Sequence, residues 1–374
     1  MTFPIAQFGT SRFLQAHVDL FVSEALKKGD AVGRIVVIQT TQSPASRKRI
    51  SAFAAAAPYV VRIRGFAGGR VVDERVEVGS VGGGVDANEQ WEEAERLFNE
   101  AQCMVSNTAD RGYETDASDR SDGPPPRSFP AKLARLLLSR YRAGAEPITL
   151  FPCELTPDNG RTLRATVLAV LDRWSAPPPA RRWIGDDCLW VNSLVDRIVS
   201  EPLEPLGAVA EPYALWAIED QPSLRLPCRH PDVVVTNDLK RYERLKLFIL
   251  NLGHTYLAEL WRRRKSDRAM TVREAMSDES MRSELNDLFD KEVIPVFAGI
   301  GMEGEARAYR ETVIDRFRNP FLDHRLAEVF TNHEAKKTRR FGGLVGLAEE
   351  NDCRVAQPRL KVALASNDGA ATAG

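Results

Sequence analysis

The residues best suited to chemistry lie in and just before residues 246–260, KLFILNLGHTYLAEL, an apolar run that also carries polar groups. On a helical wheel of about 100° per residue, one arc holds four polar residues: Glu243, Lys246, Asn251 and His254. Burying a lysine is costly unless it is paired or loses its proton. Two interpretations follow from the residues alone. One is an amphipathic helix with a lysine reaching solvent and a core histidine; the other is a general base with hydrogen-bonding partners.

The composition is that of an ordinary globular protein large enough for two domains. The chain has 374 residues, 43% of them apolar and 28% charged, and its formal net charge of −1 implies no strong field for nucleic acid or an anionic membrane. No run approaches the roughly 20 apolar residues of a membrane span, and the first residues lack a secretory pattern. The five cysteines are far apart and lack zinc spacing, so we expect free thiols in a reducing cytoplasm and no metal site.

The first half of the chain alternates strand and helix patterns. Strands are predicted at PIAQF, RIVVIQ (34–39), CMVSN and ITLFPCE, with helical patterns between them. The stretches YVVRIRG and RVVDERVEV are typical of an antiparallel hairpin. This rhythm predicts an α/β fold with an N-terminal, Rossmann-like, doubly wound domain.

The second half is different, because strand patterns nearly vanish after DVVVTND at 232–238. We therefore predict a Rossmann-like dinucleotide-binding domain over residues 1–228 and a mainly helical substrate and catalytic domain over 229–374. The polar segment 108–128 is either a mobile flank of an active site or a disordered insertion. The small, polar tail ASNDGAATAG is expected to fray.

The first strand is followed by FGTSRF, where a dinucleotide-binding turn would lie. Gly9 is present, but Ser11 stands where a second glycine is expected. The second strand does not end in the acid that usually binds the ribose of NAD, and Arg47, Lys48 and Arg49 follow it. These observations leave NADP open, and they also fit an ordinary strand–helix turn followed by solvated basic residues.

Seven motifs in register carry a family resemblance. They are QFGTSRFLQAH, VSNTAD, SFPAKLARLL, PCELTPDNG, NSLVDRIV, KLFILNLGHT and RFRNPFLDH. From residue 5 to about 345 the chain resembles the long-chain polyol and sugar-acid dehydrogenases of the mannitol dehydrogenase family. The PCEL and SFPAKL stretches are most similar to the tagaturonate (altronate) reductase branch.

The resemblance implies an NAD(P)-dependent, metal-independent oxidoreductase acting on an open-chain sugar acid or polyol. It implies a hexuronate, either tagaturonate/altronate or fructuronate/mannonate, as substrate. It also implies roles for five residues: Lys246 as general base, Asn251 and Asn159 as donors to the oxyanion, His254 as a substrate contact, and Glu243 as an aid to proton movement.

The same resemblance implies binding residues and partners. NAD, with NADP not excluded, is expected to contact Gly9, Thr10, Ser11, Phe13, Thr40, Asn107 and Thr108. An anionic substrate is expected to meet Lys336 and Arg340, unless these belong to a basic surface helix end. We expect a monomer or homodimer with no nucleic-acid or membrane partner.

Two departures keep other functions open. Ser11 replaces a fingerprint glycine, and the chain looks C-terminally shortened, since relatives continue with further helices. The alternatives are a non-catalytic, cofactor-binding relative and a mannitol or sugar-phosphate dehydrogenase.

Overall fold

The chain folds into two compact units in a computed structural model that describes residues 2–108 and 112–366. The first unit comprises Met1–Ile63, Glu74–Ala210 and Ala214–Leu239; the second comprises Arg64–Asp73, Glu211–Tyr213 and Lys240–Gly374. The division thus falls at Leu239, and two short segments from the first half of the chain join the second unit.

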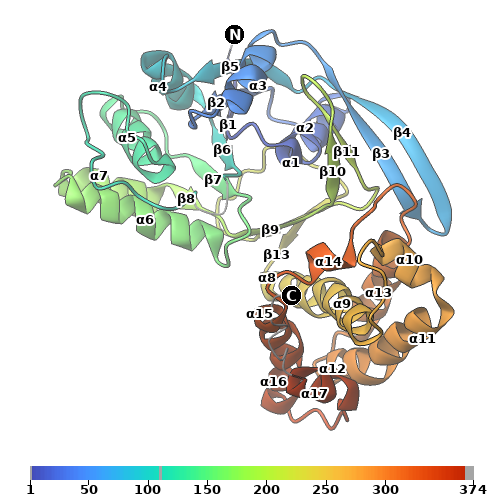
Figure 1. Cartoon of the computed structure of the whole chain (residues 1–374). Coiled ribbons are helices and arrows are strands. Elements are labelled where there is room, and N and C mark those ends of the chain that lie inside the picture. The colour runs from blue at the N-terminus through green and yellow to red at the C-terminus, as the bar shows by residue number, and fades with distance from the viewer. Residues whose placement is uncertain (1, 109–111, 367–374) are drawn as a thin grey trace, which may run out of the picture. The chain divides into compact units, whose positions relative to one another are not determined.

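A parallel six-stranded sheet forms the centre of the first unit (Figure 1). In spatial order its strands are β5 (Val81–Asp86), β2 (Ile35–Gln39), β1 (Ile5–Phe8), β6 (Cys103–Ser106), β7 (Thr149–Pro152) and β8 (Leu189–Trp190). The chain builds outward from β1 in one direction and then in the other, which is the doubly wound arrangement. Its four central strands are fully buried, as the continuous apolar runs predicted. The predicted fold class is confirmed.

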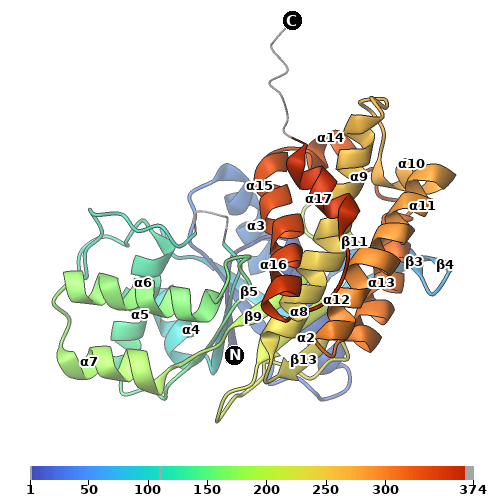
Figure 2. The ribbon, with the colours of Figure 1, turned by 90° about the horizontal axis from the view of Figure 1, so that it is seen from below.

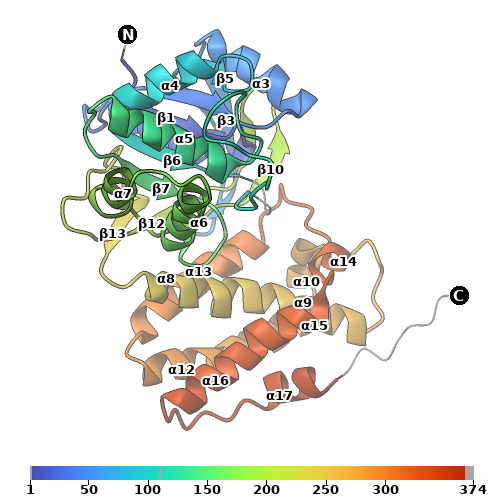
Figure 3. The same ribbon diagram turned by 90° about the vertical axis from the view of Figure 1, so that its left-hand side faces the viewer.

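Three helices cover one face of this sheet. α4 (Trp91–Glu100), α5 (Phe129–Arg142) and α6 (Asn159–Arg173) lie side by side (Figures 2 and 3) and bury their apolar stripes against β1 and β2. Helix α3 (Pro44–Ala54) follows β2 and packs beside β5, where Gly84 leaves room for Ile50 and Phe53.

The helical pattern predicted between the first two strands is built as two helices. α1 (Arg12–Gln15) and α2 (Val18–Leu26) are separated at Ala16 and His17. The His17 ring is buried between Phe13 and Phe21, and its Nε2 lies 3.0 Å from the carbonyl oxygen of Leu215. These contacts favour a non-helical backbone at His17, which local sequence patterns do not reveal.

Two smaller sheets belong mainly to the first unit, although the hairpin tip Arg64–Asp73 of one of them is part of the second unit. One has the order β10 (Val199–Pro202), β11 (Ala208–Ala210), β3 (Tyr59–Ala67) and β4 (Arg70–Val78); the other has the order β13 (Val233–Thr236), β12 (Leu215–Glu219) and β9 (Ser193–Asp196). β3 and β4 are neighbours joined through Gly68 and Gly69, so the predicted hairpin is present. Short α7 (Pro178–Arg182) and the π-helical η1 (Trp183–Asp187) precede β8.

The second unit is helical, and none of its described residues from Lys240 onward lies in a named strand. In chain order it contains α8 (Leu239–Leu245), η2 (Lys246–Asn251), α9 (Leu252–Arg263), α10 (Val272–Ser277), α11 (Glu279–Leu288), η3 (Phe289–Val293), α12 (Ile294–Gly299), α13 (Glu303–Phe317), α14 (Leu326–Val329), α15 (His333–Lys337), η4 (Thr338–Gly342), α16 (Gly343–Glu350) and α17 (Pro358–Ala365). Figure 3 shows the rod α8–η2–α9 beside the rod α15–η4–α16. Both rods contribute apolar side chains to one core.

A buried ion pair fastens the 211–213 segment to α13. Arg316 donates from Nε and Nη2 to the two carboxylate oxygens of Glu211 at 2.9 and 2.8 Å, and both side chains are 2% exposed. The Arg316 guanidinium also lies 4.4 Å from the centre of the Tyr213 ring.

The polar segment 108–128 is anchored at its end. Asp119, which is buried, accepts hydrogen bonds from the backbone N–H of Arg127 and from the hydroxyl of Ser128, both at 2.5 Å. Residues 109–111 of this segment and all but the first two residues of the tail expected to fray, 365–374, lie outside the described residues.

Two features are not found in the part of the chain that the structure describes. None of its helices combines the length and apolar character needed to cross a bilayer. No group of three or more His, Cys, Asp or Glu side chains gathers there in a way that could hold a metal ion.

Candidate active site

The polar arc predicted in the second unit is built on a π-helical turn. The backbone N–H of Leu252 bonds to the carbonyl of Leu247, five residues earlier, within the π-helical stretch Lys246–Asn251. A regular helix would set Lys246 and Asn251 roughly 140° apart at about 100° per residue. In a π turn the hydrogen bonds join residues five apart and the helix is wider, so these two residues lie closer to the same side. The α-helical wheel therefore overestimated the angle between Lys246 and Asn251, and the polar arc is narrower than it predicted.

The end of this turn is held by a half-buried cation from the neighbouring rod, Arg340. The carbonyl of Asn251 accepts hydrogen bonds from Nη1 of Arg340 at 3.0 Å and from the hydroxyl of Thr255 at 3.0 Å. The same Arg340 nitrogen lies 2.6 Å from the Thr255 hydroxyl oxygen. Arg340 is thus joined directly to the turn that carries the candidate base, although 89 residues separate it from Asn251.

His254 lies in an aromatic setting one turn further along. Its ring centre is 4.4 Å from that of Phe317 and 5.1 Å from that of His324. Burial lowers the pKa of His324, Glu328 offsets part of this effect, and the charge of Lys336 lowers the pKa again. The sequence analysis did not single out His324 as a site residue, although it lies within the RFRNPFLDH motif.

The two predicted substrate cations gather at this site without a carboxylate partner among the described residues. Lys336 donates from Nζ to the carbonyl of Val329 at 2.7 Å, and Arg340 donates only to uncharged oxygens. Burial lowers the pKa of Arg340 to about 10, with a further contribution from Arg339. Burial and the charge of Arg340 both lower the pKa of Lys336. Two adjacent, unneutralised cations favour an anion.

The other residues of the basic stretch are placed differently. Lys337 is 1% exposed, donates to the carbonyl of Ser366 at 2.6 Å and pairs with Glu334 at 2.7 Å. Arg339 is exposed. Lys246 and Glu243, the candidate base and its neighbour, are half-buried. The structure therefore brings Asn251, His254, Lys336 and Arg340 into one neighbourhood of contacts, on the helical turn that also carries Lys246.

In the first unit, the predicted dinucleotide turn lies at the carboxyl edge of the sheet, between β1 and β6. Gly9 has a φ of 117°, and a Cβ atom there would meet the Asn107 carbonyl oxygen at 2.7 Å, so this position requires glycine. Ser11 caps α1 by accepting from the N–H of Leu14 at 3.1 Å, and its hydroxyl donates to Oδ1 of Asn107 at 2.9 Å. The serine in the second glycine position thus ties the turn to β6.

A buried carboxylate supports the same edge. Glu154 accepts at one oxygen from the N–H and hydroxyl of Thr108, at 3.0 and 3.1 Å, and at the other from Ser106 and Tyr113, at 3.2 and 3.0 Å. Burial raises the pKa of Glu154, while these donors lower it. The four bonds join the loops after β6 and β7.

The remaining predicted cofactor residues border this turn. Thr10 is 5% exposed and its hydroxyl accepts from Nε of Arg49 at 3.1 Å. Thr40 is buried directly after β2, and Phe13 lies on α1 stacked against His17. Residues from three strand ends and two helices therefore meet at one edge, which fits a bound dinucleotide.

Asn159, the predicted second donor to the oxyanion, is 1% exposed and already bonded to backbone. Its Nδ2 lies 2.9–3.1 Å from the carbonyls of Pro152, Glu154 and Ser193, and its Oδ1 accepts from the N–H groups of Gly160 and Ser193. A side-chain amide has two hydrogens, so none is left for a substrate oxygen. The amide instead fixes the turn between β7 and α6.

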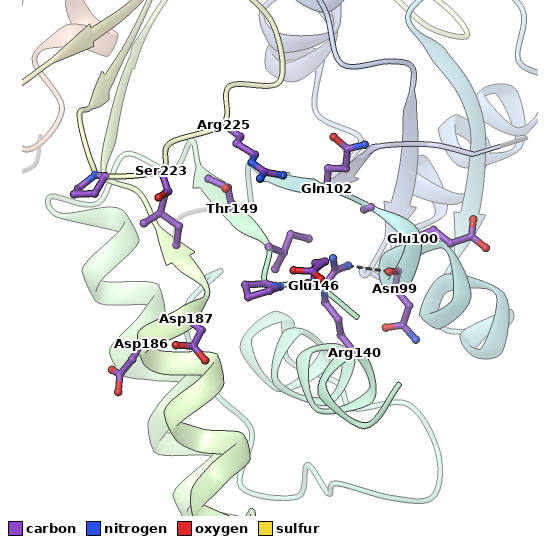
Figure 4. A pocket seen from close by; sticks show the side chains of 15 residues that line it. Asn99, Glu100, Gln102, Arg140, Glu146, Thr149, Asp186, Asp187, Ser223 and Arg225 are labelled. Carbon is purple, nitrogen blue, oxygen red and sulfur yellow. Dashed lines mark hydrogen bonds between the residues drawn. The ribbon is translucent and has the colours of Figure 1, made fainter. Parts of the chain in front are cut away.

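A cavity of about 740 Å³ opens at the opposite, amino edge of the sheet (Figure 4). Its lining includes Asn99, Gln102, Arg140 and Thr149, and the Arg140 guanidinium donates to the carbonyls of Phe98, Asn99 and Glu146. Ligands of open α/β sheets bind at the carboxyl ends of the strands. This cavity is therefore not the catalytic site.

Comparison with known proteins identifies the family. Residues 4–227 match the mannitol dehydrogenase Rossmann domain, and residues 238–366 match the mannitol dehydrogenase C-terminal domain. Altronate oxidoreductase of Halalkalibacterium halodurans is 31% identical over 357 residues, covering 88% of this chain and 67% of that protein. The altronate oxidoreductases of Bacillus subtilis and Klebsiella pneumoniae are 31% and 32% identical, covering 92% and 97% of this chain and 75% and 78% of theirs.

Two solved structures share the fold. D-sorbitol dehydrogenase in substrate-free form superposes with a TM-score of 0.82 at 22% identity, covering 97% of this chain and 79% of that one. Pseudomonas fluorescens mannitol 2-dehydrogenase, in a ternary complex with NAD and D-mannitol, superposes with a TM-score of 0.70 at 19% identity, covering 98% of this chain and 85% of that one. With both domain models matched in order, the chain belongs to the mannitol dehydrogenase family of oxidoreductases.

Proposed function

We propose that this protein transfers hydride between a nicotinamide dinucleotide and a secondary alcohol or ketone of an open-chain hexuronate, with altronate and tagaturonate as the reacting pair. The relatives named altronate oxidoreductase support this substrate. The observation that carries the proposal is the pair of unneutralised cations, Lys336 and Arg340, beside the turn that bears Lys246 and Asn251. A neutral polyol would give these cations no partner.

The residues of the second unit supply the acid–base chemistry. In ketone reduction, Lys246 donates a proton to the carbonyl oxygen as hydride reaches the carbonyl carbon, and in alcohol oxidation it removes the hydroxyl proton. The Asn251 amide stabilises negative charge on that oxygen. A bound nicotinamide supplies or accepts the hydride. His254, with an aromatic and a histidine neighbour, orients the substrate hydroxyl groups.

Asn159 has a supporting role in this proposal rather than a direct one. Its amide hydrogens are engaged by backbone carbonyls, so it positions the β7–α6 turn. Glu243, half-buried three residues before Lys246, relays protons to the base. Arg340 and Lys336 bind the substrate carboxylate.

The test is a substrate panel followed through the near-ultraviolet absorbance of the reduced nicotinamide. Tagaturonate, fructuronate, fructose and fructose 6-phosphate are each offered with NADH and with NADPH. We expect a ketohexuronate to be preferred, Lys246→Ala to abolish turnover, and Lys336→Met to lower kcat/KM for the hexuronate about 10-fold or more, the effect of one charge-assisted hydrogen bond. Lys361→Met removes an exposed lysine of α17 and serves as the matched control.

Each result has a clear meaning. Preference for fructose, with no effect of Lys336→Met, would contradict the assignment of an acid substrate. Preference for fructose 6-phosphate would favour a sugar-phosphate dehydrogenase, although burial of Lys337 leaves fewer cations for a phosphate. Binding of the dinucleotide without turnover of any ketone would favour the non-catalytic alternative.

A further inference from the structure

We infer that the dinucleotide of this protein carries a 2′-phosphate, so that NADP(H) is its preferred cofactor. This inference rests on the proposed function and on the residues at the carboxyl end of β2. In a doubly wound fold an acid there binds the ribose hydroxyls of NAD, whereas an arginine accommodates a 2′-phosphate.

The end of β2 has no carboxylate of its own. The strand ends at Gln39, and the segment to Arg49 contains no acid. The carboxylate across the sheet is Asp86 of β5, which pairs in register with Gln39. Asp86 is 7% exposed, and its Oδ1 accepts from the N–H and the amide of Asn88 at 2.9 and 2.8 Å. One oxygen of that carboxylate is thus engaged within its own turn.

Basic side chains take the place of the acid. Arg47 is exposed at the start of α3 and donates only to the backbone carbonyl of Gln42, at 3.1 Å. Arg49 donates to the hydroxyls of Thr10 and Ser46, both at 3.1 Å, and so lies between the dinucleotide turn and α3. Neither guanidinium forms an ion pair within the described residues.

One exposed carboxylate lies near these cations and is already shared. Glu204 pairs with Arg12 at 2.8 Å and with Lys48 at 3.0 Å. Burial lowers the pKa of Arg49, and the charge of Arg12 lowers it further, against an opposing effect of Glu204. Arg12, Lys48 and Arg49 therefore share one carboxylate at this edge, and the exposed Arg47 lies on the same helix as Lys48 and Arg49. The excess positive charge suits the two additional negative charges of a 2′-phosphate.

The test measures nucleotide binding directly and does not depend on the sugar substrate. Isothermal titration calorimetry on the full chain compares 2′,5′-ADP with 5′-AMP, which differ only in the 2′-phosphate. We expect 2′,5′-ADP to bind about 10-fold more tightly or better, as one or two charge-assisted hydrogen bonds would give. Arg47→Ala should remove most of this difference and leave 5′-AMP binding unchanged.

Arg142→Ala is the matched control. It removes one exposed arginine at the end of α5 and so changes the net charge equally. Equal binding of the two nucleotides, tighter binding of 5′-AMP, binding of neither, or an equal effect of Arg142→Ala would overturn the inference. Tight 2′,5′-ADP binding with no turnover of any sugar would leave the inference standing and refute the proposed substrate. Turnover favouring NADH over NADPH would refute the inference and leave the hexuronate activity intact.

Discussion

Asp19 makes the stability of the first unit depend on pH around neutrality. Its carboxylate is fully buried on α2, where one oxygen accepts from the Tyr59 hydroxyl at 2.6 Å. Burial raises the pKa of Asp19 from 3.8 to about 7, although hydrogen bonds from Tyr59 and Gln7 lower it in part. Each pH unit of such a shift corresponds to about 1.4 kcal/mol. Keeping Asp19 ionised above neutral pH therefore costs the folded protein about 4 kcal/mol.

The direction in which Asp19 makes stability change with pH follows from proton binding. The folded protein holds the Asp19 proton more tightly than the unfolded chain does, so the stabilising contribution is complete below about pH 4 and is lost as the pH rises toward about 7. Asp19→Asn copies the protonated group and still accepts from Tyr59. We expect the variant to be more stable than the wild type, with a margin that widens by about 2 to 3 kcal/mol between about pH 5 and pH 8.

Chemical denaturation of both proteins at several pH values measures this margin. Asp187→Asn, a change at an exposed carboxylate, is the control and should show a margin that does not vary with pH. A margin for Asp19→Asn that stays flat, or that falls as the pH rises, would refute the reasoning, because it would mean that the buried carboxylate is stabilised in its ionised form.

Three further substitutions test other parts of the structure. Glu154→Gln puts an amide where a carboxylate accepts four hydrogen bonds, so we expect a raised KM for the dinucleotide with a smaller change in kcat. An unchanged KM would show that the Glu154 hydrogen bonds do not shape the dinucleotide site. Gly9→Ala should weaken 2′,5′-ADP binding in calorimetry, because its Cβ would lie 2.7 Å from the Asn107 carbonyl oxygen at a φ of 117°; wild-type affinity would contradict the close approach. Glu211→Ala removes the carboxylate that pairs with the buried Arg316 and should cost about 3 to 5 kcal/mol in the free energy of unfolding. Thermal and denaturant unfolding would measure this loss, and an unchanged free energy of unfolding would contradict it.

The sequence alone determined the fold class and the type of most elements in the first unit. Continuous apolar runs such as RIVVIQ predict buried parallel strands because side chains on both faces of such a strand are covered. The order and spacing of seven motifs indicated the family, and the domain matches confirm it. The polar arc of Lys246, Asn251 and His254 could also be found from helical periodicity alone.

Only the tertiary structure decided how those groups are used. The π turn at 246–251, the Arg340 bond to the Asn251 carbonyl and the ring contact between His254 and His324 all join elements that are far apart in sequence or depart from regular helix geometry. Ser11 likewise gains its role from Asn107, 96 residues away. Local patterns report which face of an element is apolar. Which polar atoms remain available for chemistry depends on partners that long-range packing supplies, and that packing is the sum of many contacts that no short stretch of sequence contains.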